Sequence, residues 1–312
     1  MDPFERLHPG VQYHLANTLR WKGLRPTQAA AVAPILAGDD ALVLAPTAGG
    51  KTEAAMFPLL SRMATDDWQG VSVLYVCPLR ALLNNLQPRI DGYCRWLGRS
   101  AAVWHGDVGQ AQRQRILAER PDVLLTTPES LESMLVSTKV DPRVLFSGLQ
   151  AVVVDEIHAF AGDDRGWHLL AVMERLSRVA GRPLQRIGLS ATVGNPDELL
   201  SWLQGSFHDR SNAVVAPTVD TPAAPDITVD YVGSIANAAK VIASLHAGEK
   251  RLVFVDSRRR AEELGAALRA HAPRLYITNS GVHNPTGAAL SSVTAHRLLK
   301  LAEGSDLVIV ED

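Results

Sequence analysis

The chain has 312 residues, of which 46% are hydrophobic and 21% are charged, and its formal net charge is -2. This composition fits a folded protein with room for about two domains, and the net charge excludes a protein that coats nucleic acid through positive charge alone. No apolar run reaches the roughly 18 residues that cross a bilayer, no secretory signal opens the sequence, and two cysteines are too few for a disulfide framework. We therefore expect a cytoplasmic protein that has no membrane partner.

The first distinctive element is an apolar run, Ala41–Leu44, which leads into the loop sequence A-P-T-A-G-G-K-T and then into a helical segment from Thr52 to Met63. A strand that ends in such a loop before a helix directs backbone N–H groups toward phosphate oxygens. Lys51 would reach the β- and γ-phosphates, and Thr52 would hold Mg²⁺. Ala45 replaces the first glycine of the strict motif, so the loop alone also fits a glycine-rich turn. The predicted nucleotide-binding residues of this segment are Thr47, Ala48, Gly49, Gly50, Lys51 and Thr52.

Further apolar runs alternate with helical patterns up to about residue 191, and each has the length of a short strand. These runs are Val71–Cys77, Ala101–Trp104, Val123–Thr126, Ala151–Val154 and Arg186–Leu189. Strands that lie between helices and are apolar throughout are buried on both faces, which is typical of a parallel sheet in an α/β fold. We therefore expect one P-loop domain over residues 1–215, in which a parallel sheet lies between helices.

An acidic pair, Asp155 and Glu156, directly follows one of these predicted strands. At the end of a strand beside a phosphate-binding loop, Asp155 can hold the hydration shell of Mg²⁺, while Glu156 can orient and deprotonate the attacking water. Alone, the pair also fits acidic residues at a helix N-terminus. Together with the loop it predicts ATP hydrolysis, with Lys51, Asp155 and Glu156 as catalytic residues and with Thr52 and Asp155 at the metal.

The acidic pair opens the string D-E-I-H at residues 155–158, and S-A-T follows at residues 190–192. Between the loop and these strings come P-L-R-A-L at residues 78–82 and T-T-P-E-S at residues 126–130, and R-P-T-Q at residues 25–28 precedes the loop. In this order the strings resemble those of the DEAD/DEAH-box helicases of superfamily 2, and most of all the Lhr-like branch. The resemblance covers roughly residues 15 to 205 and implies a RecA-like fold with ATP and Mg²⁺ as cofactors.

This resemblance implies a role for each matching residue. The residues that bind the adenine base would be Arg25 and Gln28, and the residues that couple hydrolysis to a partner domain would be His158, Ser190 and Thr192. The residues that bind nucleic acid would be Pro78, Arg80, His105, Gly106, Thr127 and Pro128. A hydroxyl or a guanidinium holds phosphates without reading bases, so this grip would be independent of sequence. Taken singly, Thr127 also fits a strand end before a helix, and Arg80 a surface charge.

The motifs together predict an ATP-dependent helicase or translocase that acts on single-stranded or duplex nucleic acid. DNA is favoured over RNA by the Lhr-like resemblance, and no metal other than Mg²⁺ is expected. The alternative is a nucleotide-dependent module that binds nucleic acid or protein and has vestigial hydrolysis. This alternative rests on a missing feature, since the sequence does not contain the family's arginine finger. Such an arginine contributes about three to five powers of ten to the rate of hydrolysis. We expect weak turnover without unwinding from this chain by itself.

The proline-containing segment 216–240 is predicted to be a linker, and residues 241–312 a short second unit. The elements predicted after the prolines are strands at Ile227–Val232, Arg251–Val255 and Arg274–Ile277 and a helix at Arg258–Ala270. The segment 251–258 resembles the opening strand of a second RecA-like domain. We therefore expect an incomplete second α/β unit.

The end of the chain carries a second resemblance. The string N-P-T-G at residues 284–287 and the segment 306–312 resemble a fragment of a fold-type I aminotransferase. In that family the residues matching Asn284 and Asp312 contact pyridoxal phosphate. An ordinary loop at residues 284–287 is the alternative. The second unit is thus either a truncated RecA-like domain or a fused aminotransferase-like fragment.

Overall fold

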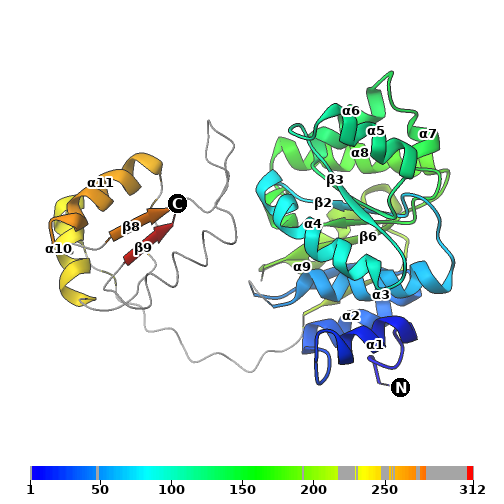
Figure 1. Ribbon diagram of the computed structural model, residues 1–312, viewed down its shortest axis with the longest axis horizontal. Coiled ribbons are helices and arrows are strands. Elements are labelled where there is room, and N and C mark those ends of the chain that lie inside the picture. Colours follow the sequence, from blue (N-terminus) through cyan, green and yellow to red (C-terminus); the bar gives the residue numbers. More distant parts are fainter. Residues whose placement is uncertain are drawn as a thin grey trace. The chain divides into compact units, whose positions relative to one another are not determined.

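The computed structural model describes residues 2–46, 49–191, 193–216, 229, 231–246, 253, 255, 257–271, 275–278 and 308–311. The chain divides into two compact units, Met1–Thr221 and Pro222–Asp312. Figure 1 shows a sheet with helices on both sides in the first unit. Every predicted site residue of the helicase resemblance falls in this first unit.

The first unit is built on one seven-stranded sheet in the order β3-β4-β2-β5-β6-β1-β7. The strands are β1 (Asp40–Leu44), β2 (Val73–Val76), β3 (Ala101–Trp104), β4 (Val123–Thr126), β5 (Ala151–Val154), β6 (Gln185–Ser190) and β7 (Asn212–Val215). Every neighbouring pair is parallel. The prediction of an α/β fold with a parallel sheet between helices is therefore confirmed.

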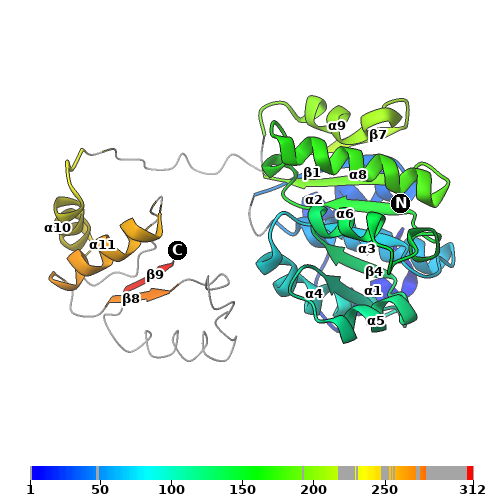
Figure 2. The same cartoon turned by 90° about the horizontal axis from the view of Figure 1, so that it is seen from above.

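Two layers of helices cover this sheet, as Figure 2 shows from above. The first layer contains α1 (Pro9–Asn17), α2 (Pro26–Ala37), α3 (Lys51–Thr65) and α4 (Arg80–Arg95). The second contains α5 (Gln110–Glu119), α6 (Pro128–Val136), α7 (Pro142–Leu145), α8 (Asp164–Ala180) and α9 (Pro196–Gln204). The chain moves along the sheet in one direction through α3 and α4 and in the other through α5 to α9. The two layers follow from this reversal, because crossovers between parallel strands are right-handed.

The strand side chains alternate between the two layers. In β2, Val73 and Tyr75 pack in the core beneath α3 and α4, whereas Leu74 and Val76 pack in the core beneath α6 to α9. Every residue of β2 is buried, which is the pattern of a strand covered on both faces. This alternation decides which side chains meet at the end of the sheet.

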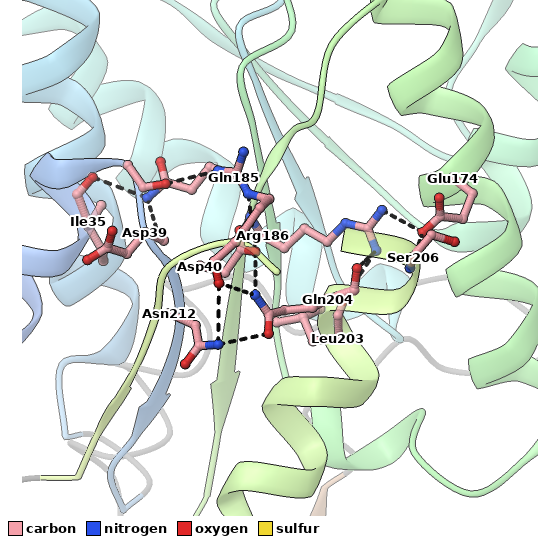
Figure 3. A network of polar contacts seen from close by, with 12 residues as sticks. Ile35, Asp39, Asp40, Glu174, Gln185, Arg186, Leu203, Gln204, Ser206 and Asn212 are labelled. Atoms are coloured by element: carbon pink, nitrogen blue, oxygen red, sulfur yellow. Dashed lines mark hydrogen bonds and ion pairs between the residues drawn. The ribbon is translucent and has the colours of Figure 1, made fainter. Parts of the chain in front are cut away.

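A buried polar network fastens the N-terminal edge of the sheet, where β1, β6 and β7 begin (Figure 3). Asp40 Oδ1 accepts from the Arg186 backbone N–H at 2.8 Å, and Asp40 Oδ2 accepts from Gln204 Nε2 at 3.0 Å. The Arg186 guanidinium donates to the Leu203 carbonyl at 3.0 Å and to Glu174 Oε1 at 2.9 Å. Since Arg186 is only 1% exposed, these partners compensate a fully buried charge.

The second unit contains α10 (Ile235–Leu245), α11 (Arg258–Arg269) and a parallel pair of strands, β8 (Leu275–Thr278) and β9 (Val308–Glu311). Helix α10 begins inside the segment predicted as a linker, because Ser234 caps it by accepting from the Asn237 N–H at 3.2 Å. Two predicted strands of this unit are wrong at the residues that the structure describes.

The first of these segments is 227–232. Its described residues belong to no strand, and Val229 and Tyr231 are 90% and 97% exposed. The alternating pattern there meets no partner strand within the described part of the unit. In the segment 251–255, Val253 and Val255 pack against the apolar cluster of α10 and α11 without strand pairing. That this unit is a truncated RecA-like domain stays a prediction, and Asn284 and Asp312 lie outside the described residues.

Among the helices that the structure describes, none combines the length and the apolar character that crossing a bilayer requires.

Candidate active site

The predicted site residues gather along one edge of the sheet. Parallel strands all end at the same edge, and each predicted motif except the one at residues 25–28 lies at or directly after a strand end. Strands β1, β5 and β6 are neighbours and carry the phosphate loop, the acidic pair and Ser190. Strands β2, β4 and β3 are also neighbours and carry the residues predicted to bind nucleic acid. The two predicted functions therefore occupy adjoining halves of a single edge.

The loop between β1 and α3 is shaped by its two glycines. Gly49 donates its N–H to the Pro46 carbonyl at 2.9 Å, and a Cβ at this position would lie 2.8 Å from the same oxygen. Gly50 has a φ of 80° and caps α3, a left-handed conformation that a side chain disfavours. Thr47 and Ala48 lie outside the described residues. The tight turn therefore requires glycine at both described positions.

Lys51 and Thr52 form the first turn of α3 and are buried. The Lys51 ammonium donates to the carbonyls of Ala45 and Pro46 at 2.9 and 3.3 Å, so it folds over the loop. Thr52 Oγ1 accepts from the Arg89 guanidinium at 3.0 Å. Arg89 also pairs with Glu53, at 3.5 Å between Nε and Oε1. One cation thus lies against the loop and another lies at the start of the helix.

The acidic pair lies where β5 ends. Asp155 Oδ2 accepts from the Tyr75 hydroxyl at 2.7 Å, and Asp155 Oδ1 accepts from the Glu156 N–H at 2.9 Å. Burial raises the pKa of Asp155, which the Tyr75 hydrogen bond and the charge of Lys51 oppose. Burial and the Asp155 carboxylate raise the pKa of Tyr75 well above its usual value. Tyr75 therefore stays protonated, and its hydroxyl donates a hydrogen bond to the Asp155 carboxylate.

Glu156 has a φ of 48° and a ψ of 45°, a left-handed conformation that is uncommon for a residue other than glycine. Residues held in such conformations cluster at functional sites, because the surrounding structure must impose them. Here the strand β5 before Glu156 and the 3-10 turn Ile157–Ala159 after it fix the backbone on both sides. Its side chain is half-buried.

The loop and the acidic pair face the same cavity, which has a volume of about 330 Å³. The residues that line it are Trp21, Arg25, Gln28, Gly49, Gly50, Lys51, Thr52, Glu53, Arg89, Asp155 and Glu156. Elements far apart in the sequence are therefore brought to one hollow. The Thr52 hydroxyl and the Asp155 carboxylate are hard oxygen donors, which is the kind that Mg²⁺ prefers.

The segment before α2 joins this cavity through Gln28. Gln28 Oε1 accepts from the Arg25 N–H at 2.9 Å, and its Nε2 lies 3.4 Å from the Gly50 carbonyl as a donor. Gln28 is buried, and Trp21 lines the cavity beside it. The two residues predicted to bind adenine are therefore fixed against the phosphate loop.

The predicted coupling residues connect β5 with β6. His158 Nδ1 lies 3.0 Å from Ser190 Oγ and 3.5 Å from Glu156 Oε2. Ser190 is fully buried, and its carbonyl accepts from the Ala45 N–H of the phosphate loop at 3.2 Å. Thr192 lies outside the described residues. His158 and Ser190 thus form a short bridge from the acidic pair to the loop.

At the other half of the edge, two arginines hold the segment that contains His105 and Gly106. Arg80 pairs with Asp107 at 2.9 Å between Nη1 and Oδ1. The Arg113 guanidinium donates to the carbonyls of His105 and Gly106 at 3.1 and 2.9 Å. Burial lowers the pKa of His105, and its Nε2 lies 2.9 Å from Asn84 Oδ1. The segment is therefore held in one conformation.

Thr127 and Pro128 begin α6. Thr127 caps this helix, since its hydroxyl oxygen accepts from the Ser130 N–H at 3.4 Å, and its side chain is buried. The Thr127 hydroxyl therefore caps a helix, which agrees with the alternative of a strand end before a helix. The Pro78 carbonyl accepts from the Arg165 guanidinium at 2.8 Å.

Three residues of this site carried no signal in the sequence. Glu53 and Arg89 line the cavity, and Tyr75 donates a hydrogen bond to Asp155, which also lines it. Tyr75 reads as one more apolar position in a strand, and Arg89 as a polar position in an amphipathic helix. Only the strand pairing and the packing of α4 bring them to the site.

Comparisons with known proteins place this geometry in a family. The sequence profile of the DEAD/DEAH box helicases matches residues 25–199. The chain is 37% identical over 290 residues to the Lhr helicase/probable uracil glycosylase of Mycolicibacterium smegmatis, which covers 84% of this chain and 18% of that protein. It is 32% identical over 243 residues to the ATP-dependent helicase Lhr-Core of Methanothermobacter thermautotrophicus. This match covers 72% of this chain and 27% of that protein.

Solved structures agree with these matches. The structure of Mycobacterium smegmatis helicase Lhr bound to ssDNA and AMP-PNP aligns with a TM-score of 0.75 and 30% identity, over 100% of this chain and 42% of that one. The chain thus spans less than half the length of these relatives. The predicted RecA-like fold and the Lhr-like resemblance are confirmed. By its profile, its fold and its motifs, the chain belongs to the DEAD/DEAH box helicase family.

Proposed function

We propose that this chain binds and hydrolyses ATP as part of an ATP-dependent nucleic-acid helicase or translocase. The observation that carries the proposal is the cavity of about 330 Å³ that both Lys51 and the pair Asp155 and Glu156 line. A phosphate cradle and a carboxylate pair in one hollow are what phosphoryl transfer to water requires. Neither element would serve this chemistry without the other.

In this proposal each residue has one role toward the nucleotide. The N–H groups of Gly49 and Gly50 hold the phosphates and Lys51 neutralises their charge, after Gly49 and Lys51 leave the loop carbonyls that they now contact. Gln28 and Arg25 bind the base, and Glu156 takes the proton of the attacking water. Thr52 and Asp155 would hold Mg²⁺, which neutralises charge on the phosphates. No group of three His, Cys, Asp or Glu among the described residues forms a metal cage, and a magnesium ion shared with phosphates needs none.

The adjoining half of the edge is proposed to hold one strand of nucleic acid by its phosphates. Arg80 supplies an exposed cation there, and the Gly106 segment supplies backbone held in one conformation. The Lhr relative was solved with ssDNA and AMP-PNP, which supports single-stranded DNA as the first substrate to test. His158 and Ser190, between the acidic pair and the loop, are proposed to report the state of the nucleotide.

The test measures ATP binding and phosphate release with and without single-stranded DNA or RNA. Lys51→Ala should abolish nucleotide binding, because it removes the cation that neutralises the phosphates. Glu156→Gln should keep binding and lose turnover by two orders of magnitude or more, as expected for a missing general base. Strand-stimulated release in the wild type with these two losses supports the proposal.

Other outcomes would contradict it. Nucleotide binding that Lys51→Ala leaves unchanged would show that the cavity is not the ATP site. Strand binding that depends on ATP, without any phosphate release at high protein concentration, would instead select a binding module with vestigial hydrolysis.

A further inference from the structure

Tyr75 carries no charge and belongs to none of the sequence motifs. Tyr75 is 0% exposed and lies in the centre of β2. A buried hydroxyl needs a partner, and here the partner is the carboxylate proposed to act at the metal, Asp155. The inference developed from this contact rests on the proposed function.

The register of the sheet explains why these two side chains meet. Tyr75 pairs with Val153 in the neighbouring strand β5, and Asp155 lies two residues beyond Val153. Because side chains alternate along a strand, Tyr75, Val153 and Asp155 all face the α3 side of the sheet. The aromatic ring spans the distance from the middle of β2 to the end of β5.

The contact fixes the orientation of the Asp155 carboxylate. Its Oδ2 accepts from the Tyr75 hydroxyl at 2.7 Å, and its Oδ1 accepts from the Glu156 N–H at 2.9 Å. With one donor on each oxygen, the carboxylate cannot rotate without breaking a hydrogen bond. Water does not compete for this position, because Tyr75 is fully buried and Asp155 is only 8% exposed.

We propose that Tyr75 is a positioning residue, whose hydroxyl holds the Asp155 carboxylate in the orientation that a magnesium–nucleotide complex needs. Outer partners of this kind orient metal-binding groups, and their loss typically lowers metal affinity by about 10- to 100-fold. Tyr75 does not line the cavity, and it acts through Asp155, which does.

The test is Tyr75→Phe in the full chain, since this change removes the hydroxyl and keeps the ring. The probe is a fluorescent ATP analogue, titrated at a series of MgCl₂ concentrations and in EDTA. We expect the Mg²⁺ concentration for half-maximal tightening of binding to rise about tenfold. Affinity in EDTA should stay that of the wild type, because Lys51 and the loop are unchanged.

Tyr93→Phe is the matched control. Tyr93 donates from a similarly buried hydroxyl to a carboxylate, Glu53 Oε1, at 3.0 Å, but Glu53 is not proposed to hold the metal. This variant should keep the Mg²⁺ dependence of the wild type. An equal loss in Tyr93→Phe would overturn the proposal, since any buried tyrosine would then have the same effect.

A double-mutant cycle separates positioning from general stability. Adding Tyr75→Phe to Asp155→Asn should not raise the Mg²⁺ concentration for half-maximal tightening any further, because the hydroxyl acts through that carboxylate. The proposal would be overturned if the two substitutions had additive effects on the Mg²⁺ requirement. It would also be overturned if folded Tyr75→Phe kept the wild-type Mg²⁺ requirement, or if this variant lost affinity for the analogue in EDTA as well. Failure of the proposed function is distinguishable, since the wild type would then bind no nucleotide in the presence of Mg²⁺.

Discussion

At the scale of single residues, the exposed ion pair of Arg80 and Asp107 opposes the proposed binding of a strand. The two side chains are 53% and 66% exposed and lie 2.9 Å apart. An exposed pair of this kind contributes about 0–1 kcal/mol to stability, so it does little for the fold. Asp107 does pair with the Arg80 guanidinium that a phosphate would contact, and it places a negative charge beside the bound strand.

Asp107→Asn should therefore raise the affinity for single-stranded DNA by roughly two- to fivefold at low salt, with the gain falling as salt is added. Fluorescence anisotropy of a labelled oligonucleotide measures it. Asp66→Asn is the control, because Asp66 pairs with Arg62 in an i,i+4 contact at the far end of α3 and makes the same change of charge. Equal affinities for Asp107→Asn and the wild type would contradict the prediction, and Arg80→Ala should lower affinity.

At the scale of elements, α8 is fastened to β6 through Glu174 and Arg186. Burial raises the pKa of Glu174, but hydrogen bonds from Arg186 and from the Ser206 N–H outweigh it, so the pKa lies below its usual value of 4.5. A depressed pKa means that this contribution to stability is fully present above pH 4.5. It is lost as the pH falls through the lower pKa of the folded state.

Glu174→Gln should lower the free energy of unfolding at pH 7 by about 1–3 kcal/mol, since it weakens a charged hydrogen bond to buried Arg186. The difference from the wild type should shrink as the pH falls below 4.5. Urea unfolding at several pH values measures both effects. A difference that stays constant down to acid pH would show that the ion pair is not its source.

The elements also show what the sequence can and cannot predict. Strands β2 to β6 were predictable because they are short apolar runs between helices. The edge strand β7 was missed, because its four residues are mostly half-exposed and its partner β1 lies far away in the sequence. The strand predicted at 227–232 has the alternating pattern but no described partner. Local pattern decides strand character, whereas pairing depends on the rest of the chain.

The same limit applies to the site. Lys51, Asp155 and Glu156 were predictable because a strand end places them at one edge, and they line one cavity. Tyr75 and Arg89 were not, because their contacts depend on the register of β2 with β5 and on the packing of α4. Thr127 was assigned to nucleic acid, yet its buried hydroxyl caps α6, a role that the motif alone could not distinguish. The roles of all these residues in catalysis and binding stay predictions.

At the scale of the whole first unit, the reactivity of the two cysteines shows whether its core is folded. Cys77 and Cys94 are free thiols buried in the core beneath α3 and α4. Burial raises the pKa of Cys77 to about 12 and raises that of Cys94 further. A buried thiol with a raised pKa is unreactive, so both should react only when this core opens.

We therefore expect a chromogenic disulfide reagent to label two thiols rapidly in denaturant and almost none in the native chain at pH 8. ATP with Mg²⁺ should slow native labelling further, because a ligand that binds only the folded state stabilises it. The absorbance of the released reagent measures both rates. Rapid native labelling of either thiol would contradict the buried position of these side chains.

Strand β1, which carries the phosphate loop, lies between β6 and β7, both of which come much later in the chain. The bond from the Arg186 N–H to Asp40 spans 146 residues. At roughly 5–20 residues per second on the ribosome, this interval is on the order of ten seconds. During synthesis the apolar strand β1 therefore has no neighbouring strand until β6 and β7 have been made.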